Sequence, residues 1–174
     1  MPLDALPPDS PKAAIPRAAD RLTLAREIVA DYEGLRTIAY RCPAGCWTIG
    51  YGHTKGVKPG DRITPGQAGI LLDRDLRDFA AGVAALIRVP LGEPGHAACI
   101  SFAYNIGLGA FEDSTLLFLL NQRRYAAAGE QFGRWTRAGG EILPGLARRR
   151  AAERQLFLAG IPAAPATQTA QAPK

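Results

Sequence analysis

The sequence predicts a mostly helical α+β domain with a small N-terminal antiparallel β-lobe, a long connecting helix and a C-terminal helical lobe around a cleft. Three observations lead to this fold class. Apolar residues recur at helical spacing from residue 22 onward. A glycine-rich stretch of short alternating segments then occupies residues 36–60. A long helical pattern and four further helix-like stretches follow it. A chain of 174 residues is long enough to bury one core of its own.

The first predicted helix begins near residue 22 and ends at Glu33, where a glycine follows as a stop signal. Its apolar positions share one helical face and are Leu22, Ala25, Ile28, Val29 and Tyr32. Residues 1–20 carry five prolines and no periodicity. This composition predicts a disordered tail ahead of the domain.

The β-lobe and the long helix follow in that order. Residues 36–60 contain T-I-G-Y-G and end in K-P-G-D, which predicts a two- or three-stranded antiparallel sheet with tight turns. Thr64 and Pro65 supply an N-cap and a proline at the first helical position, so a helix begins there and runs to about residue 87. A helix that joins a β-lobe to a helical lobe leaves a cleft between them, and such clefts are favoured binding sites.

The C-terminal lobe consists of helix-like stretches at 94–106, 114–122, 124–136 and 145–159, with Ser114 as an N-cap. The last stretch has a basic first half and an apolar second half. Residues 161–174 form a second tail rich in Pro, Ala, Thr and Gln, so the predicted domain spans residues 21–160.

Charge and cysteine content narrow the class of protein. The net charge of +5 and the pI of about 9.4 fit attraction to a polyanion, but charge alone does not choose among nucleic acid, anionic lipid and an acidic cell-wall polymer. Three cysteines cannot all pair, and they form no repeated C-x-x-C pattern. The two histidines, His53 and His96, lie far apart, so no metal site is expected. Cys99 lies in an apolar helical stretch and is predicted to be a buried, unreactive thiol.

Two further patterns concern the location of the chain. No apolar run approaches the roughly 20 residues that cross a bilayer. The first residues show no charged segment followed by an apolar core of the secretory type. We therefore expect synthesis in the cytosol without a signal peptide.

Three residues near the predicted cleft carry reactive or polar groups. Glu33 ends a helix, where the helix dipole disfavours its charge, and partial burial would disfavour it further, as a general acid requires. Thr48 lies in a strand segment, and His53 follows the glycines of that strand, with Asp75 as its expected partner. Taken one at a time, these residues also fit roles without a catalytic function: a surface acid, an ordinary strand threonine and a structural histidine.

The joint pattern is more specific than its parts. Glu33 is followed after eight residues by Cys42, after five more by Thr48, and then by I-G-Y-G-H-T. Later segments read A-C-I-S-F-A-Y-N-I-G-L-G-A-F-E-D-S-T-L-L, W-T-R-A-G-G and L-P-G-L-A-R-R-R-A-A-E. This ordered series resembles the phage-type lysozymes of glycoside hydrolase family 24, which include the endolysins of lambdoid phages, over roughly residues 22–159.

The resemblance implies a lysozyme-like fold and a muramidase that hydrolyses the β-1,4 bond between N-acetylmuramic acid and N-acetylglucosamine in peptidoglycan. It places Glu33 at the general acid and Thr48 at the residue that holds the attacking water together with an aspartate. His53 falls on a histidine that supports the site. Further candidates for substrate binding or support are Tyr51, Asn105, Arg148 and Arg149. One of the two arginines is expected to contact the acid. No cofactor or metal is expected.

Cys42 stands where many relatives of this family have the catalytic aspartate. The resemblance implies that cysteine is an accepted alternative there, giving a Glu/Cys/Thr triad. A thiol acts through its thiolate, whose ordinary pKa is about 8.5. It could serve as base, as nucleophile or as a weak substitute. Cys46 lies four residues away across a predicted turn, so a disulfide that caps the catalytic sulfur is left open.

Two alternatives and several partner expectations complete the prediction. A lytic transglycosylase would form a 1,6-anhydro product without water, and an inactive module would bind peptidoglycan or membrane through residues 145–159. The expected partner is peptidoglycan and not nucleic acid, with contact to anionic membrane or lipopolysaccharide left open, and the chain is expected to be a monomer. The resemblance further implies release from the host cytoplasm to the periplasmic wall by a holin-type route.

Overall fold

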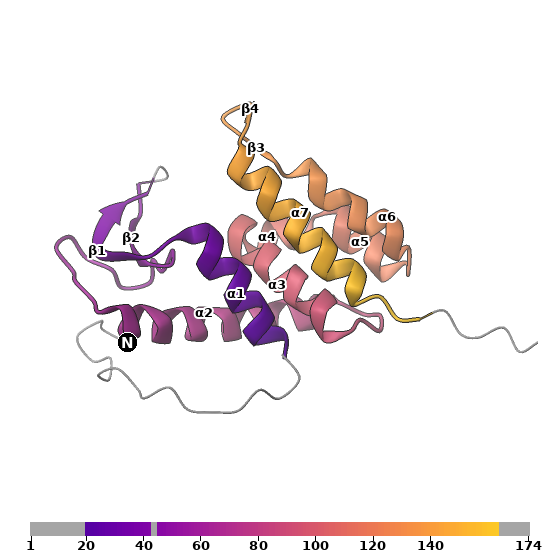
Figure 1. Ribbon diagram of the computed structural model, residues 1–174, viewed down its shortest axis with the longest axis horizontal. Helices are drawn as coiled ribbons and strands as arrows, with labels where there is room; N and C mark the ends of the chain where they lie inside the picture. The colour runs from indigo at the N-terminus through magenta and orange to yellow at the C-terminus, as the bar shows by residue number, and fades with distance from the viewer. Residues whose placement is uncertain (1–19, 43–44, 164–174) are drawn as a thin grey trace, which may run out of the picture.

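The computed structural model describes residues 20–42 and 45–163 of the chain. Figure 1 shows a small β-lobe at one end, a helical lobe at the other and one long helix beneath both. The elements, in chain order, are α1 (Arg21–Glu33), β1 (Arg36–Arg41), β2 (Trp47–Gly50), α2 (Pro65–Leu86), α3 (Glu93–Ile106), α4 (Leu108–Glu112), α5 (Thr115–Asn121), α6 (Tyr125–Glu130), the 3₁₀ turn η2 (Gln131–Arg134), β3 (Arg137–Ala138), β4 (Glu141–Ile142) and α7 (Pro144–Ala159). The predicted fold class is confirmed.

The β-lobe is a two-stranded antiparallel sheet of β1 and β2, with an irregularity in register between Arg36 and Tyr40. A third segment joins β1 through an isolated bridge between Ile38 and Arg62. Ile49, fully buried on β2, belongs to a small apolar cluster that also includes the first turns of α2. The lobe is therefore anchored to the long helix, which fixes its distance from the helical lobe.

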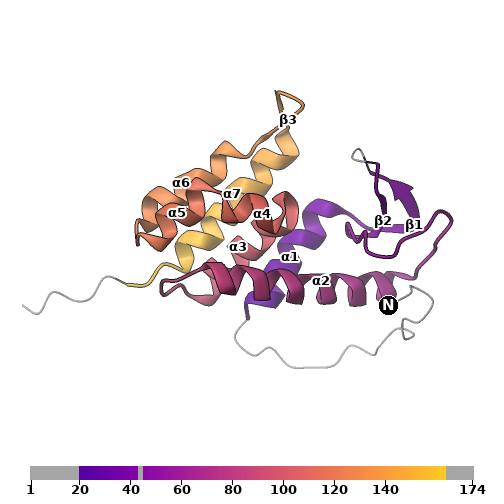
Figure 2. The ribbon, with the colours of Figure 1, turned by 180° about the vertical axis from the view of Figure 1, so that it is seen from behind.

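Helix α2 begins where the sequence predicted. The Thr64 side chain accepts a hydrogen bond from the Gln67 amide, and the Gln67 side chain accepts one from the Thr64 amide, forming a capping box. Pro65 follows as the first helical residue. The helix runs 22 residues along the base of the molecule, as the two opposite views in Figures 1 and 2 show. It connects the lobes as predicted.

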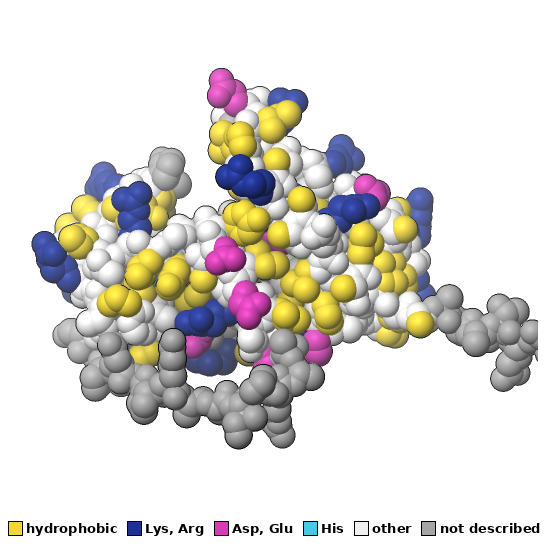
Figure 3. All heavy atoms as spheres, viewed as in Figure 1, with side chains coloured by type: hydrophobic (Ala, Val, Ile, Leu, Met, Phe, Trp, Pro, Cys, Tyr) yellow, Lys and Arg dark blue, Asp and Glu magenta, His cyan; other side chains and the backbone are white. Residues whose placement is uncertain are grey.

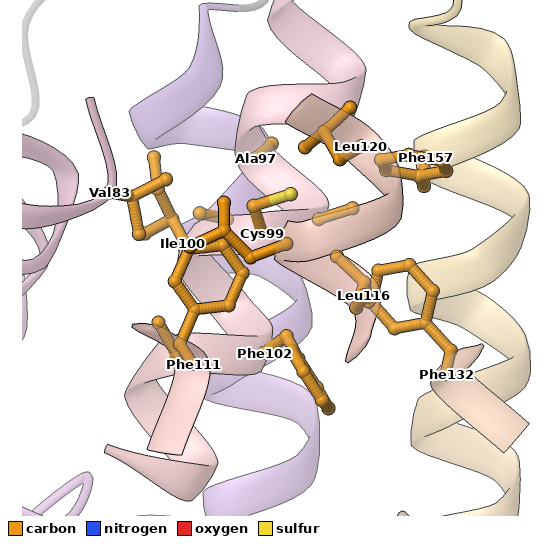
Figure 4. Close-up of a cluster of buried hydrophobic side chains, with 14 of the residues drawn as sticks. Val83, Ala97, Cys99, Ile100, Phe102, Phe111, Leu116, Leu120, Phe132 and Phe157 are labelled. Carbon is orange, nitrogen blue, oxygen red and sulfur yellow. The ribbon is translucent and has the colours of Figure 1, made fainter. Parts of the chain in front are cut away.

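Helix α3 forms the centre of the main core and packs against α1, α2 and α7. Figure 4 shows the aromatic and aliphatic side chains gathered around it. The Phe102 ring meets Phe111 and Phe132 at centroid distances of 6.3 and 5.1 Å in edge-on geometry. Cys99 is fully buried in this cluster, as expected, and burial raises the pKa of its thiol above the usual range. That thiol is therefore unreactive.

The structure differs from the sequence prediction between residues 124 and 142. The single helix expected over 124–136 is a short α6 followed by the 3₁₀ turn η2, and a hairpin of β3 and β4 follows where none was predicted. Its two-residue loop is Gly139-Gly140, with φ of +58° and +87°. A two-residue hairpin turn of this kind requires positive φ at both positions, which two glycines supply.

The predicted terminal tails lie outside the described residues except for Asp20 and residues 161–163. The predicted turn at Pro43-Ala44 lies outside them as well. Within the described part of the chain, no helix combines the length and apolar character that crossing a membrane requires.

Candidate active site

The candidate acid, Glu33, is the last residue of α1, and Gly34 ends the helix with φ of +70°. Its side chain is 23% exposed, so one part of the carboxylate can meet solvent or substrate. Its Oε1 accepts a hydrogen bond of 2.6 Å from Nη1 of Arg149. This contact confirms that one of the two predicted arginines reaches the acid. Arg148, one residue earlier on α7, is exposed.

Arg149 is held in place by three elements. It is 2% exposed. Its Nε donates to Oε1 of Glu153 at 3.0 Å, and its Nη2 donates to the carbonyl oxygen of Ser101 at 3.1 Å. The guanidinium therefore links α7, α3 and the end of α1, and it fixes the orientation of the Glu33 carboxylate against a rigid core.

The other carboxylate oxygen of Glu33 faces the β-lobe at Gly52. A Cβ placed on Gly52 would lie 3.9 Å from Oε2 of Glu33 and 3.7 Å from Cε1 of Tyr104. The Tyr104 hydroxyl donates a 2.8 Å hydrogen bond to the carbonyl oxygen of Tyr51 and so ties α3 to this loop. Burial raises the pKa of Tyr104, so the hydroxyl stays protonated as a donor. Asn105 follows Tyr104 in the last turn of α3 and is half-buried.

His53 connects the β-lobe to α2, as predicted. Its Nδ1 lies 2.8 Å from Oδ2 of Asp75, and its Nε2 lies 2.9 Å from the carbonyl oxygen of Lys55. The residue is 6% exposed. These contacts orient the ring from both sides and hold the loop that carries Gly52. In this structure His53 is enclosed, as expected.

Cys42 and Thr48 share one backbone acceptor at the tip of the β-lobe. The carbonyl oxygen of Cys46 accepts a 2.9 Å hydrogen bond from the Cys42 amide and a 3.2 Å hydrogen bond from the Thr48 hydroxyl. Thr48 is 3% exposed, and Cys42 is half-buried. Cys42 and Cys46 form no disulfide in this structure, so the disulfide left open by the sequence is not present here.

A hollow separates the β-lobe from the column formed by α7 and the β3–β4 hairpin, as Figure 3 shows. A cavity of about 250 Å³ also adjoins Gly52, and Thr54, Phe79 and Tyr104 are part of its lining. The Phe79 and Tyr104 rings of this lining lie 5.1 Å apart, measured between their centroids. Gly52, which approaches Glu33, thus lines a concave surface with both polar and aromatic walls, and concave surfaces are favoured ligand sites.

The comparison with protein families decides the assignment. The model of the family described as phage lysozyme matches residues 30–153, which include the acid, the β-lobe and the arginine pair. The chain belongs to the phage lysozyme family. Phage lysozymes are glycoside hydrolases that act on peptidoglycan, so the predicted enzyme class and substrate class are confirmed.

Individual relatives agree with the family model. The chain is 44% identical over 134 residues to an endolysin of Acyrthosiphon pisum secondary endosymbiont phage 1, covering 75% of this chain and 92% of that protein. It is 41% identical to an endolysin of Bacillus phage B103, covering 76% of this chain but only 52% of that longer protein. Among solved structures, the muramidase domain of SpmX from Asticaccaulis excentricus has a TM-score of 0.73 at 38% identity, covering 77% of this chain and 94% of that one.

Several residues of the site were not predicted from the sequence. Ser101 and Glu153, which hold Arg149, were not singled out, and neither was the close approach of Gly52 to the acid. The spacing R-R-x-x-E in the last helix was the available signal for Glu153, because residues three and four apart share a helix face. Within the described part of the chain, no group of three or more His, Cys, Asp or Glu side chains could hold a metal ion.

Proposed function

We propose that this phage lysozyme is an endolysin muramidase in which Glu33 is the general acid and Cys42 and Thr48 position or activate the opposing group. The observation that carries the proposal is the 2.6 Å contact of Arg149 with Oε1 of Glu33. It holds the carboxyl group in one orientation while its other oxygen lies near Gly52. A general acid needs this combination of fixed position and access to the glycosidic oxygen.

The reaction requires two groups on opposite sides of the sugar. Glu33 delivers its proton to the departing glycosidic oxygen, a step that typically contributes about 10²–10⁴ in rate. On the other side, a water or a nucleophile attacks the anomeric carbon. Since one carboxylate of the usual pair is replaced by Cys42, that second role passes to the thiolate and to the residues around it.

Cys42 and Thr48 suit this second role because Cys46 ties them together. The Thr48 hydroxyl donates its hydrogen to the Cys46 carbonyl, which leaves the hydroxyl oxygen to accept a hydrogen from a water. A Cys42 thiolate would accept the other hydrogen of the same water or attack the sugar itself. A water held by the Thr48 hydroxyl oxygen and the thiolate would keep its lone pair available to attack the anomeric carbon.

The alternative of an inactive membrane-binding module is less well supported. It relied on an exposed amphipathic run at 145–159, but Arg149, Arg150 and Phe157 of α7 are at most 2% exposed. We propose instead that contact with anionic polymer or lipid uses the β-lobe. Residues 34–63 contain five cations, Arg36, Arg41, Lys55, Lys58 and Arg62, against the single acid Asp61. These five cations are exposed.

Location and assembly are proposed on the same family basis. Relatives of the chain are named endolysins of phages. We propose that the protein is made in the host cytoplasm, reaches the periplasmic wall after holin-type release and acts there as a monomer.

Mass spectrometry of digested sacculi tests the proposed reaction. A muramidase releases muropeptides with free reducing ends, and these are the expected products. A predominance of 1,6-anhydro products would instead show a lytic transglycosylase. Intact sacculi after digestion with folded protein would show a binding module. The digestion is repeated with and without dithiothreitol, and a rate that depends on the reductant would implicate a disulfide at Cys42.

A further inference from the structure

A buried polar cluster lies directly behind the acid, on α3 and α7. Ser101, Arg149, Arg150 and Glu153 are each at most 2% exposed. Oε1 of Glu153 accepts three hydrogen bonds: from Ser101 Oγ at 2.7 Å, from Arg149 Nε at 3.0 Å and from Arg150 Nη2 at 3.0 Å. An oxygen that accepts three donors, two of them cationic, is that of a carboxylate.

This cluster is costly to bury. Desolvation lowers the pKa of Arg150 to about 10, and desolvation raises the pKa of Glu153 although both guanidiniums oppose the shift. Arg150 offsets part of its cost by lying 4.8 Å over the Phe102 ring. Two arginines and one glutamate leave an excess of one positive charge inside the protein. Besides Glu153, the acidic residue that Arg149 contacts is Glu33.

Arg149 is the member of the cluster that contacts both carboxylates. One edge of its guanidinium meets Glu33 at 2.6 Å, and its Nε meets Glu153 at 3.0 Å. Charges this close interact strongly in a site with little water. Glu153 therefore acts on Glu33 in two ways: it holds the guanidinium in one orientation, and it offsets part of the positive charge that Glu33 experiences.

We propose that Glu153, supported by Ser101, is a positioning residue that orients Arg149 against Glu33 and sets the pH range in which the acid holds its proton. This inference rests on the proposed role of Glu33 as general acid. The acid works in its protonated form, which a nearby cation disfavours and a nearby anion favours. Glu153 thus extends activity toward alkaline pH, because it moderates the effect of Arg149.

Other charged or titratable groups belong to the elements near Glu33, among them Arg150 and Tyr104, which interact with it electrostatically, but they are the same in wild type and Glu153→Gln. Arg150 lies on α7 and Tyr104 on α3, while Cys42 and the His53–Asp75 pair belong to the β-lobe and its junction with α2. Replacing Glu153 by glutamine changes none of them. A downward shift of the alkaline limb in that variant is therefore attributable to the lost negative charge, because loss of the Arg149 contact alone would move the limb up.

The test compares the pH dependence of kcat/KM on soluble peptidoglycan fragments for wild type, Glu153→Gln and Arg149→Met. In Glu153→Gln the alkaline limb should move down by about one pH unit, which is about a tenfold relative loss on that side. In Arg149→Met the limb should move up. The matched control is Glu130→Gln, which removes an exposed glutamate that pairs with Arg154 between α6 and α7, and its profile should coincide with wild type.

A purely structural role gives a different result. A variant that is only less stable but stays folded across the assayed pH range keeps the wild-type midpoint of the alkaline limb, so an unshifted limb in folded Glu153→Gln contradicts the proposal. If that variant does not fold, a downward shift or no shift in Arg149→Met contradicts it equally. A ¹³C NMR titration of the Glu33 carboxyl group separates this inference from the proposed function. Its midpoint should move in the same directions even if Glu33 proves not to be the acid.

Discussion

Replacing Gly52 by alanine tests how closely the β-lobe approaches the acid. Gly52 has φ of +101°, and a Cβ at this position would lie 3.9 Å from Oε2 of Glu33 and 3.7 Å from Tyr104. These distances are ordinary contacts, so the methyl group fits without a clash. It would nevertheless cover the oxygen that faces the opening. The variant should therefore fold but lose activity.

The size of each effect follows from the backbone and the contact. An alanine forced to positive φ costs about 1–2 kcal/mol. For a domain of this size that lowers Tm by about 3–8 °C. Covering or displacing the carboxylate should lower kcat by about tenfold or more, because small misplacements of a reacting group are costly.

Gly60→Ala is the matched control for this experiment. Gly60 also has positive φ, at +88°, but a Cβ there would have no neighbour within 4 Å. Thermal unfolding and the rate of muropeptide release are measured for both variants. Both should lose similar stability, and only Gly52→Ala should lose activity. Equal activity losses in the two variants, or full activity in Gly52→Ala, would contradict the site described above.

Three further predictions concern the thiol, the pH dependence of stability and the core. Cys42→Ser should be nearly inactive in sacculus digestion and Cys42→Asp should remain active, since a hydroxyl is not ionised near neutral pH; full activity of the serine variant would remove position 42 from the chemistry. The Arg21 side chain lowers the pKa of Glu93, so this pair stabilises the fold at neutral pH. Its contribution to stability is lost as the pH falls through that lowered pKa. Glu93→Gln should therefore lower Tm at pH 7 and leave Tm nearly unchanged at strongly acid pH. Phe157 is fully buried against Phe132, so Phe157→Ala should lower the free energy of unfolding, measured by urea denaturation, by about 3–5 kcal/mol. A loss below about 1 kcal/mol would contradict the packing.

Local signals predicted much of the fold. Thr64 and Pro65 place the start of α2 correctly because the cap satisfies backbone amides that only residues at a helix start leave unpaired. Ser114 caps α5 in the same way. The pairing of His53 with Asp75 was also predictable, since the loop after β2 must return to the beginning of the long helix.

Features that depend on tertiary contacts were missed. The sequence predicted that one arginine of the run at 145–159 reaches Glu33, but not that Arg149 and Arg150 are both buried and share Glu153. Arginine is usually exposed, so the sequence alone does not predict that these side chains are buried. Only the packing of α3 against α7 shows which groups compensate their charge. The approach of Gly52 to Glu33 depends on how the β-lobe sits on α2, and no local pattern encodes that distance.

The most direct test of the central claim is the rate at which Glu33→Gln releases reducing ends from purified sacculi. Glutamine keeps the shape of the side chain but cannot deliver a proton. The control is Glu27→Gln, which changes an exposed acid on the same helix. We expect Glu33→Gln to bind sacculi and to lose hydrolysis by at least about 10²-fold, while Glu27→Gln digests them at the wild-type rate. Hydrolysis by folded Glu33→Gln at near wild-type rate would show that the acid is a different residue.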